Sequence, residues 1–250
     1  MLEKVRVLRS HGLQYVKDLR KQMVSELFRG RPVISQGMTA EEKRKAASVC
    51  PVYAIDETEG SIDLGKCVFC RECAFLLPQK IRFTNDYKIA ANVRESLVVK
   101  PGDEDMIRLD EKKIRKEVRK LFGSALKLRQ VSAAGDNSCE MELGATMNVN
   151  FDFGRFGVEF VASPRHADGI VITGPISENM ENALRITYEA IPEPKIIILA
   201  GTDAISGGIF NDSQAVNRKF LQEHDIDLYV PGNPCHPLTF INGVMDLLGI

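Results

Sequence analysis

The stretch Lys195-Ile-Ile-Ile-Leu-Ala-Gly201 decides the fold of this chain. An unbroken apolar run of this kind predicts a strand that is buried on both faces, as the strands of a parallel sheet are. The run is also far too short to cross a bilayer, because a membrane-spanning helix needs ~20 apolar residues. We therefore expect any membrane association to be peripheral or to occur through partner subunits.

Further strands and helices alternate around this stretch. Strands are expected over residues 125–131, 157–161, 169–173 and 227–230. Helices are expected over about 178–190 and 237–248. Short apolar strands separated by helices predict an α/β domain, here residues 125–250, with a mostly parallel sheet covered on both faces. Ligands of such sheets bind beyond the carboxyl ends of the strands.

Cysteines mark a separate segment, residues 33–100, which is predicted to be a small α+β domain. Cys67, Cys70 and Cys73 form a C-x2-C-x2-C pattern, and a distant Cys50 is followed by proline. In two-cluster bacterial ferredoxins the full pattern is C-x2-C-x2-C-x3-C-P, and its fourth cysteine binds the other cluster.

Both halves of a ferredoxin repeat align with this segment. One half keeps its three cysteines but ends in Leu77-Pro78, whereas the other keeps Cys50-Pro51 but has Ala40, Lys43 and Ala46 at the triplet positions. The four remaining cysteines are the ligands of a single crossed cluster, so the segment resembles a ferredoxin domain that retains one 4Fe-4S cluster and has lost the other. A zinc site and four unrelated buried thiols are the alternatives, although zinc sites more often use two paired C-x-x-C motifs.

The composition is that of an ordinary globular chain. It has 250 residues, 44% of them hydrophobic, and a net charge of −1, so no electrostatic bias toward nucleic acid is expected. Four of its six cysteines lie in the metal motif, and no signal-peptide pattern is seen, which favours a reducing cytoplasmic setting without disulfides. The G-x-G-x-x-G fingerprint of NAD and FAD sites does not occur.

The two remaining segments are rich in charge. Residues 1–32 are predicted to form one amphipathic helix, with eight Lys and Arg against three acidic residues, or 8 − 3 = +5. Such a helix can lie on an anionic membrane or dock on an acidic partner, and a solvated face of a helix packed on its own domain is the alternative. Residues 101–124 are predicted to be a charged linker followed by a surface helix, which places a domain boundary there.

Three loops follow the predicted strands at the ligand-binding edge. They read Ala134-Gly-Asp-Asn-Ser-Cys-Glu-Met-Glu142, Gly201-Thr-Asp-Ala-Ile-Ser-Gly-Gly208 and Pro231-Gly-Asn-Pro-Cys-His-Pro237. From about residue 120 onward the chain resembles the small subunit of complex-I-related, membrane-bound nickel-iron hydrogenases, which is similar to the 20 kDa subunit of respiratory complex I. The stretches that carry this resemblance are Phe151 to Pro175, Asn179-Met180, Glu193-Pro-Lys195, Gly207-Gly208 and Pro231-Gly232.

The resemblance implies a flavodoxin-like sheet and a proximal 4Fe-4S cluster held by the three loops. The corresponding ligand positions here are Asp136, Cys139, Asp203 and Asn233, so one of the four is still cysteine. Three interpretations stay open: no cluster, with polar hydrogen bonding in its place; an altered cluster or a single metal ion held by Asp136, Cys139, Asp203 and Cys235; or two plain buried thiols. Because iron–sulfur clusters prefer soft thiolate ligands, a standard second cluster or metal is doubtful.

The resemblance further implies an electron-transfer subunit of an oxidoreductase complex, with any catalytic centre on a separate large subunit. Implied partners are that hydrogenase-like large subunit and the membrane subunits of the same complex, with a soluble redox donor as a further candidate. The expected location is the cytoplasmic face of the membrane, reached through partner subunits. The alternative is a structural or assembly subunit whose second domain has lost its redox function.

Overall fold

The computed structural model describes residues 2–123 and 125–250. Its C-terminal part is built around a five-stranded sheet in which every neighbouring pair of strands is parallel. In spatial order the strands are β6 (Val158–Phe160), β5 (Leu126–Ser132), β7 (Gly169–Thr173), β8 (Ile196–Ala200) and β9 (Leu228–Val230). Numbered along the chain this is the order 2-1-3-4-5, which is the flavodoxin-like topology. The α/β prediction is therefore confirmed.

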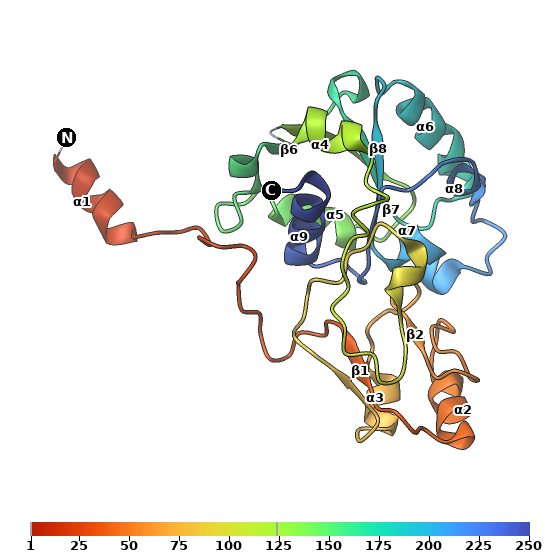
Figure 1. Cartoon of the computed structure of the whole chain (residues 1–250). Coiled ribbons are helices and arrows are strands. Elements are labelled where there is room, and N and C mark those ends of the chain that lie inside the picture. The colour runs from red at the N-terminus through yellow and green to blue at the C-terminus, as the bar shows by residue number, and fades with distance from the viewer. Residues whose placement is uncertain (1, 124) are drawn as a thin grey trace.

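Helices cover both faces of this sheet (Figure 1). Alternate residues of β8 divide between the two cores: Ile196 and Ile198 face one, whereas Ile197 and Leu199 face the other. The first core is closed by α4 (Lys116–Phe122), α5 (Ser138–Ala145) and α9 (Pro237–Leu248). The second is closed by α6 (Glu178–Glu189), α7 (Thr202–Ser206) and α8 (Lys219–Glu223). All five residues of β8 are buried, as the sequence predicted.

The N-terminal part, residues 32–99, contains two small antiparallel sheets and two α-helices. Strand β1 (Pro32–Ile34) pairs with β3 (Ile81–Phe83), and β2 (Ile62–Asp63) pairs with β4 (Val98–Val99). The helices are α2 (Ala40–Ser48) and α3 (Glu72–Leu76). Among the described residues, four short 3-10 helices lie at Arg94–Leu97, Phe153–Phe156, Pro164–His166 and Gly208–Phe210.

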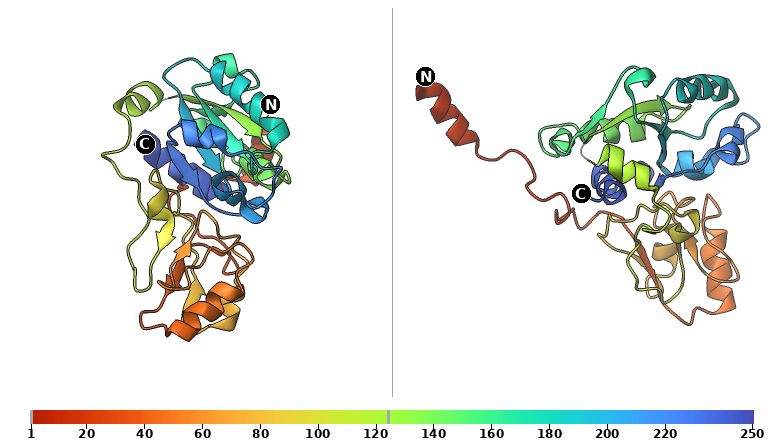
Figure 2. Two further views of the ribbon diagram at one scale, coloured as in Figure 1. Left: turned by 90° about the vertical axis from the view of Figure 1, so that its right-hand side faces the viewer. Right: turned by 45° about the horizontal axis from the view of Figure 1, so that its top comes forward.

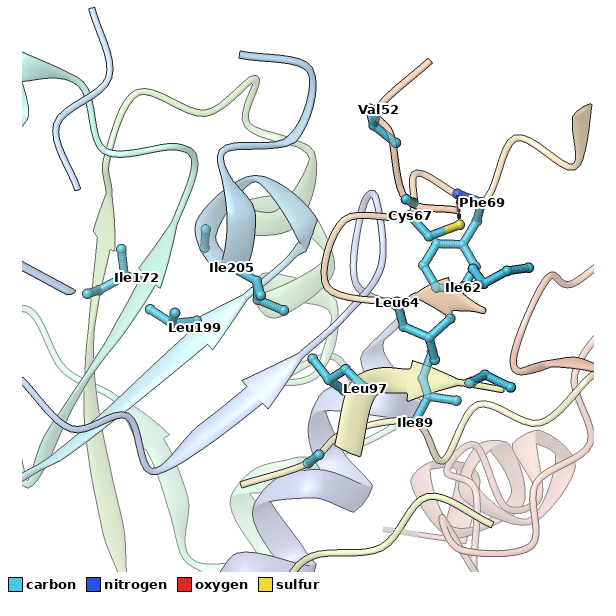
Figure 3. Packing of buried hydrophobic residues seen from close by; sticks show 14 of the residues in the cluster. Val52, Ile62, Leu64, Cys67, Phe69, Ile89, Leu97, Ile172, Leu199 and Ile205 are labelled. Carbon is cyan, nitrogen blue, oxygen red and sulfur yellow. Dashed lines mark hydrogen bonds between the residues drawn. The ribbon is translucent and has the colours of Figure 1, made fainter. Parts of the chain in front are cut away.

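The two parts pack against each other without a gap between their cores. Leu64, Leu97 and Ile89 of the N-terminal part belong to the same buried cluster as Leu199 and Ile205 of the sheet domain (Figure 3). At the sheet edge, the backbone of Ala91 exchanges two hydrogen bonds with Tyr229 of β9, at 3.0 and 2.8 Å. The exposed edge of β9 is thereby covered, which is how native sheets avoid edge-to-edge association.

The prediction of one helix over residues 1–32 is wrong after His11. Helix α1 runs only from Leu2 to His11, and Gly12 follows it with a φ of 62°. Only some apolar residues of the extended segment after it pack on the sheet domain. Leu19 is buried, and its carbonyl accepts a hydrogen bond from the Asn242 side chain at 3.0 Å, whereas Met23 and Leu27 stay exposed. Tertiary contact has therefore overridden the helical spacing of these residues. Met1 lies outside the described residues.

None of the helices in the described part of the chain combines the length and the apolar character needed to span a membrane. Helix α1 stands apart from the rest of the molecule in Figure 1 and in the right-hand view of Figure 2, joined to it by the extended segment.

Candidate functional site

The structure brings together all four cysteines of the predicted cluster site. Cys50 comes from the loop that follows α2, and the other three come from the loop leading into α3. All four line one cavity, with Cys67 and Cys73 buried and the other two partly buried. Apolar side chains, among them Val52, Ile62 and Phe83, form the rest of its wall. We call this cavity the cluster site.

The backbone around the cluster site turns N–H groups toward sulfur. The N–H of Phe69 donates to the Cys67 sulfur at 3.3 Å, and that of Ala54 donates to the Cys50 sulfur at 3.2 Å. Phe69 and Arg71 have φ values of 54° and 71°, which side-chain-bearing residues seldom adopt. A backbone in which residues of positive and negative φ alternate turns successive N–H groups toward one point. Such concave nests bind anions and iron–sulfur clusters.

The two buried thiols of the cluster site, Cys67 and Cys73, need a nearby positive charge to ionise. Burial raises the pKa of Cys67 far above that of an ordinary thiol, and the neighbouring thiols raise it further. Burial also raises the pKa of Cys73 to about 11. Thiolates are the metal-binding form, and a bound metal supplies the charge that deprotonates them. Four soft sulfur donors in an apolar, N–H-lined cavity fit an iron–sulfur cluster in chemistry and in number.

Residues distant in sequence hold the three-cysteine loop in place, and sequence reasoning missed them. Arg94 binds both carboxylate oxygens of Asp63, at 2.8 and 2.7 Å, and the Asp63 carbonyl accepts the Cys67 N–H at 2.9 Å. Arg29 donates to the Phe69 carbonyl at 2.9 Å. Neither arginine belongs to a recognisable motif, so only folding reveals these contacts.

The three loops of the sheet domain meet at a second, smaller cavity. It lies beside strands β5 and β7, between which the strand order of the sheet reverses direction. Asp136, Cys139, Asp203 and Asn233, the four positions implied by the resemblance, all line it. We call this the second site. Cys235 does not line it: its fully buried thiol lies beside that of Cys139 in the core beneath α9.

Hydrogen bonds already engage the polar groups of the second site. Asp136 accepts from both the N–H and the hydroxyl of Ser138, at 2.9 and 2.5 Å, and these bonds lower its pKa. Asn233 donates to Asp203 at 3.4 Å. Burial, followed by the charge of Asp136, raises the pKa of Asp203. The two carboxylates therefore repel each other across the cavity.

One buried hydroxyl connects the two sites. Thr202, which lines the second site, donates through its Oγ1 to the carbonyl of Cys67 at 2.9 Å. Its own N–H bonds the carbonyl of Gly232 in the third loop at 2.8 Å. A β-carbon at neighbouring Gly201, where φ is 96°, would collide with the Cys139 sulfur. The cysteine loop and all three sheet loops are thus fixed relative to one another.

Over residues 2–123 and 125–250, no group of three or more His, Cys, Asp or Glu side chains is positioned to hold a metal ion. The thiols of the cluster site surround a cavity. This arrangement suits a cluster of several irons, in which each thiolate binds a separate iron, better than it suits one central ion.

Comparison with known proteins identifies the sheet domain. A family model described as NADH ubiquinone oxidoreductase, 20 kDa subunit, matches residues 137–247. A probable membrane-bound hydrogenase subunit of Pyrococcus furiosus is 32% identical over 139 residues, which cover 54% of this chain and 83% of that protein. The chain therefore belongs to the family of the complex I 20 kDa subunit, and the resemblance expected from the sequence is confirmed.

Other relatives align over the same domain. Formate hydrogenlyase subunit 7 of Escherichia coli is 37% identical over 53% of this chain and 52% of its own length. An NADH-quinone oxidoreductase subunit of Geotalea daltonii is 40% identical over 44% of this chain and 64% of its own length. Among solved structures, a chain of an archaeal membrane-bound sulfane sulfur reductase is 27% identical, with a TM-score of 0.45, over 51% of this chain and 70% of that one.

Proposed function

We propose that this chain is an electron-transfer subunit that holds one 4Fe-4S cluster at Cys50, Cys67, Cys70 and Cys73. The observation that supports it is the convergence of these thiols, from two separate segments, on one apolar cavity with N–H groups directed at sulfur. A cluster bound there would accept and release one electron at a time. The chain's own contribution is to shield the cluster from water and to set its potential through N–H···S bonds and burial.

In this proposal the second site holds no proximal cluster. Three of the four ligand positions present oxygen or nitrogen, which are poor donors for iron–sulfur clusters. Cys235 is not a replacement ligand in this proposal, because its fully buried thiol lies beside that of Cys139 and does not line the cavity. In place of bonds to a cluster, hydrogen bonds of Asp136 and Asn233 would hold the loops of the second site.

The partners follow from the relatives. A hydrogenase-like large subunit would cover the edge where the three loops meet, and would carry any catalytic centre. Membrane subunits of the same complex would hold the chain at the membrane, as the membrane-bound hydrogenase relative suggests. The donor and acceptor are other redox proteins or subunits of that complex.

The direct test is anaerobic purification followed by iron and acid-labile sulfide counting and EPR of the reduced protein. About four irons per chain are expected, as one 4Fe-4S cluster requires. Cys70→Ser should abolish the EPR signal, whereas Cys139→Ser, the matched change at the second site, should leave it intact. Protein without iron would refute the proposal that the four cysteines hold a cluster. About eight irons per chain would refute the proposal that the second site holds none.

A structural or assembly role is the second candidate, and the loss of thiolates at the second site favours it. In that case the chain binds the large subunit but passes it no electrons. Rapid mixing of the reduced complex with an electron acceptor separates the two: an EPR signal at the cluster site that is reoxidised within turnover supports electron transfer, and a signal that persists supports the structural role.

A further inference from the structure

Helix α1 has nothing to cover it within the described chain. None of its residues is buried, and Leu2 and Leu8 are 87% and 70% exposed. It projects from the body on the extended segment that follows it (Figure 1). Isolated helices shorter than about 12–15 residues are marginal in water, and α1 has ten. A surface that takes up its apolar side chains would supply the missing stability.

The apolar side chains of α1 form a stripe with cations along its borders. Leu2, Val5 and Leu8 recur every third residue and so share one side of the helix. Arg6, four residues after Leu2, and Lys4, four residues before Leu8, lie on the two borders of this stripe. Arg9, four residues after Val5, lies within the stripe in the last turn of the helix. Glu3 and Val7 lie on the other side. Long cationic side chains beside an apolar stripe reach lipid headgroups while the stripe enters the bilayer boundary.

We propose that α1 binds directly to an anionic phospholipid surface and anchors this chain beside the membrane. Charge complementarity favours lipid: α1 carries three Lys and Arg against one acid, although the whole chain has a net charge of −1. A fluid interface needs no groove of complementary shape, and each basic residue there adds its own attraction to anionic headgroups. The extended segment fixes the helix to the body through buried Leu19. This proposal does not depend on the cluster.

The test is co-sedimentation of the full chain with vesicles of phosphatidylcholine alone or mixed with phosphatidylglycerol. Binding is expected only to the mixed vesicles, and it should weaken as salt is raised. Arg6→Gln and Arg9→Gln should each lower the partition constant about fivefold, as expected for a basic residue at an anionic surface.

Val5→Ser and Val7→Ser form a matched pair, because the two valines are 45% and 47% exposed on the same helix. Val5→Ser should weaken binding about tenfold through lost apolar burial, whereas Val7→Ser should have little effect. Neither change should alter the melting temperature of the body. Equal binding to both vesicles, no binding, or equal effects of the two substitutions would overturn the proposal. So would α1 variants that bind vesicles normally but no longer assemble with partner subunits.

Discussion

Thr202 connects the cluster site with the loops of the sheet domain through a single hydroxyl. Its side chain is fully buried, and the bond to the Cys67 carbonyl is 2.9 Å long. A donor at this carbonyl withdraws electron density from the peptide next to a cluster ligand. Hydrogen bonds of this kind are among the means by which proteins tune cluster potentials.

Thr202→Val is therefore expected to lower the midpoint potential of the cluster by on the order of tens of millivolts, because a lost hydrogen bond is worth about 1 kcal/mol. Redox titration followed by EPR measures this shift, and Thr202→Ser, which keeps the hydroxyl, should restore the potential. Thr146→Val is the control, since Thr146 is equally buried but bonds Leu143 within its own helix. Equal shifts in the two valine variants would argue against a specific role.

Asp203 makes the stability of the protein depend on pH. Burial, and then the Asp136 charge, raise its pKa above the ordinary value of 3.8. The folded chain thus retains a proton that the unfolded chain has lost, so the free energy of unfolding falls as pH rises through this interval. Asp203→Asn should raise the melting temperature of the metal-free protein at neutral pH, and the difference should vanish below pH 3.8. Asp105→Asn, at an exposed position, should show no such dependence.

At the scale of elements, the short helix α7 relies on one arginine. Arg218 donates to the carbonyls of Ala204 and Ile205, at 2.9 and 2.6 Å, and so satisfies two groups that a five-residue helix leaves unpaired. It also donates at 3.3 Å to the Asp203 carbonyl, which accepts the Gly207 N–H as well. Burial lowers the pKa of Arg218 to about 10, which still leaves it charged at neutral pH. Because α7 carries Thr202 and Asp203, this arginine positions both sites.

Arg218→Met should lower the free energy of unfolding by about 3 kcal/mol, since several buried carbonyls lose a charged donor. Urea denaturation measures this loss. Arg218→Lys should recover only part of it, because an ammonium lacks the planar fork of donors. Arg108→Met, at an exposed position, is the control and should stay within about 0.5 kcal/mol of the parent.

The elements also show where periodicity succeeds as a predictor. Each predicted strand of the sheet and the helix over 237–248 were found within a residue or two. Their apolar patterns face fixed surfaces on the sheet, so the pattern and the packing agree. Between Gly12 and Arg31 the apolar pattern is equally regular, but the extended chain buries Leu19 and packs the partly buried Phe28 against the sheet domain instead.

At the scale of the whole molecule, one buried cluster spans the N-terminal part and the sheet domain (Figure 3). We expect a single cooperative unfolding transition, in which far-UV circular dichroism and cluster absorbance change together. Leu64→Ala, at a fully buried position in the N-terminal part, should lower the stability of both parts by about 2–5 kcal/mol. Leu121→Ala, at a residue 52% exposed, should not. Two separate transitions would instead indicate independently folding domains.

Local periodicity and the spacing of cysteines were enough to predict the fold class and the candidate ligands of the cluster site, and the family of the sheet domain was implied by the resemblance of separate sequence stretches. The sequence also marked the second site as poor in thiolates. It took the folded molecule to show that the Cys235 thiol lies beside that of Cys139, that Thr202 bonds the cysteine loop, and that residues 12–31 are not helical. The physical reason is that these outcomes depend on which distant surfaces are buried together, and no local pattern encodes that.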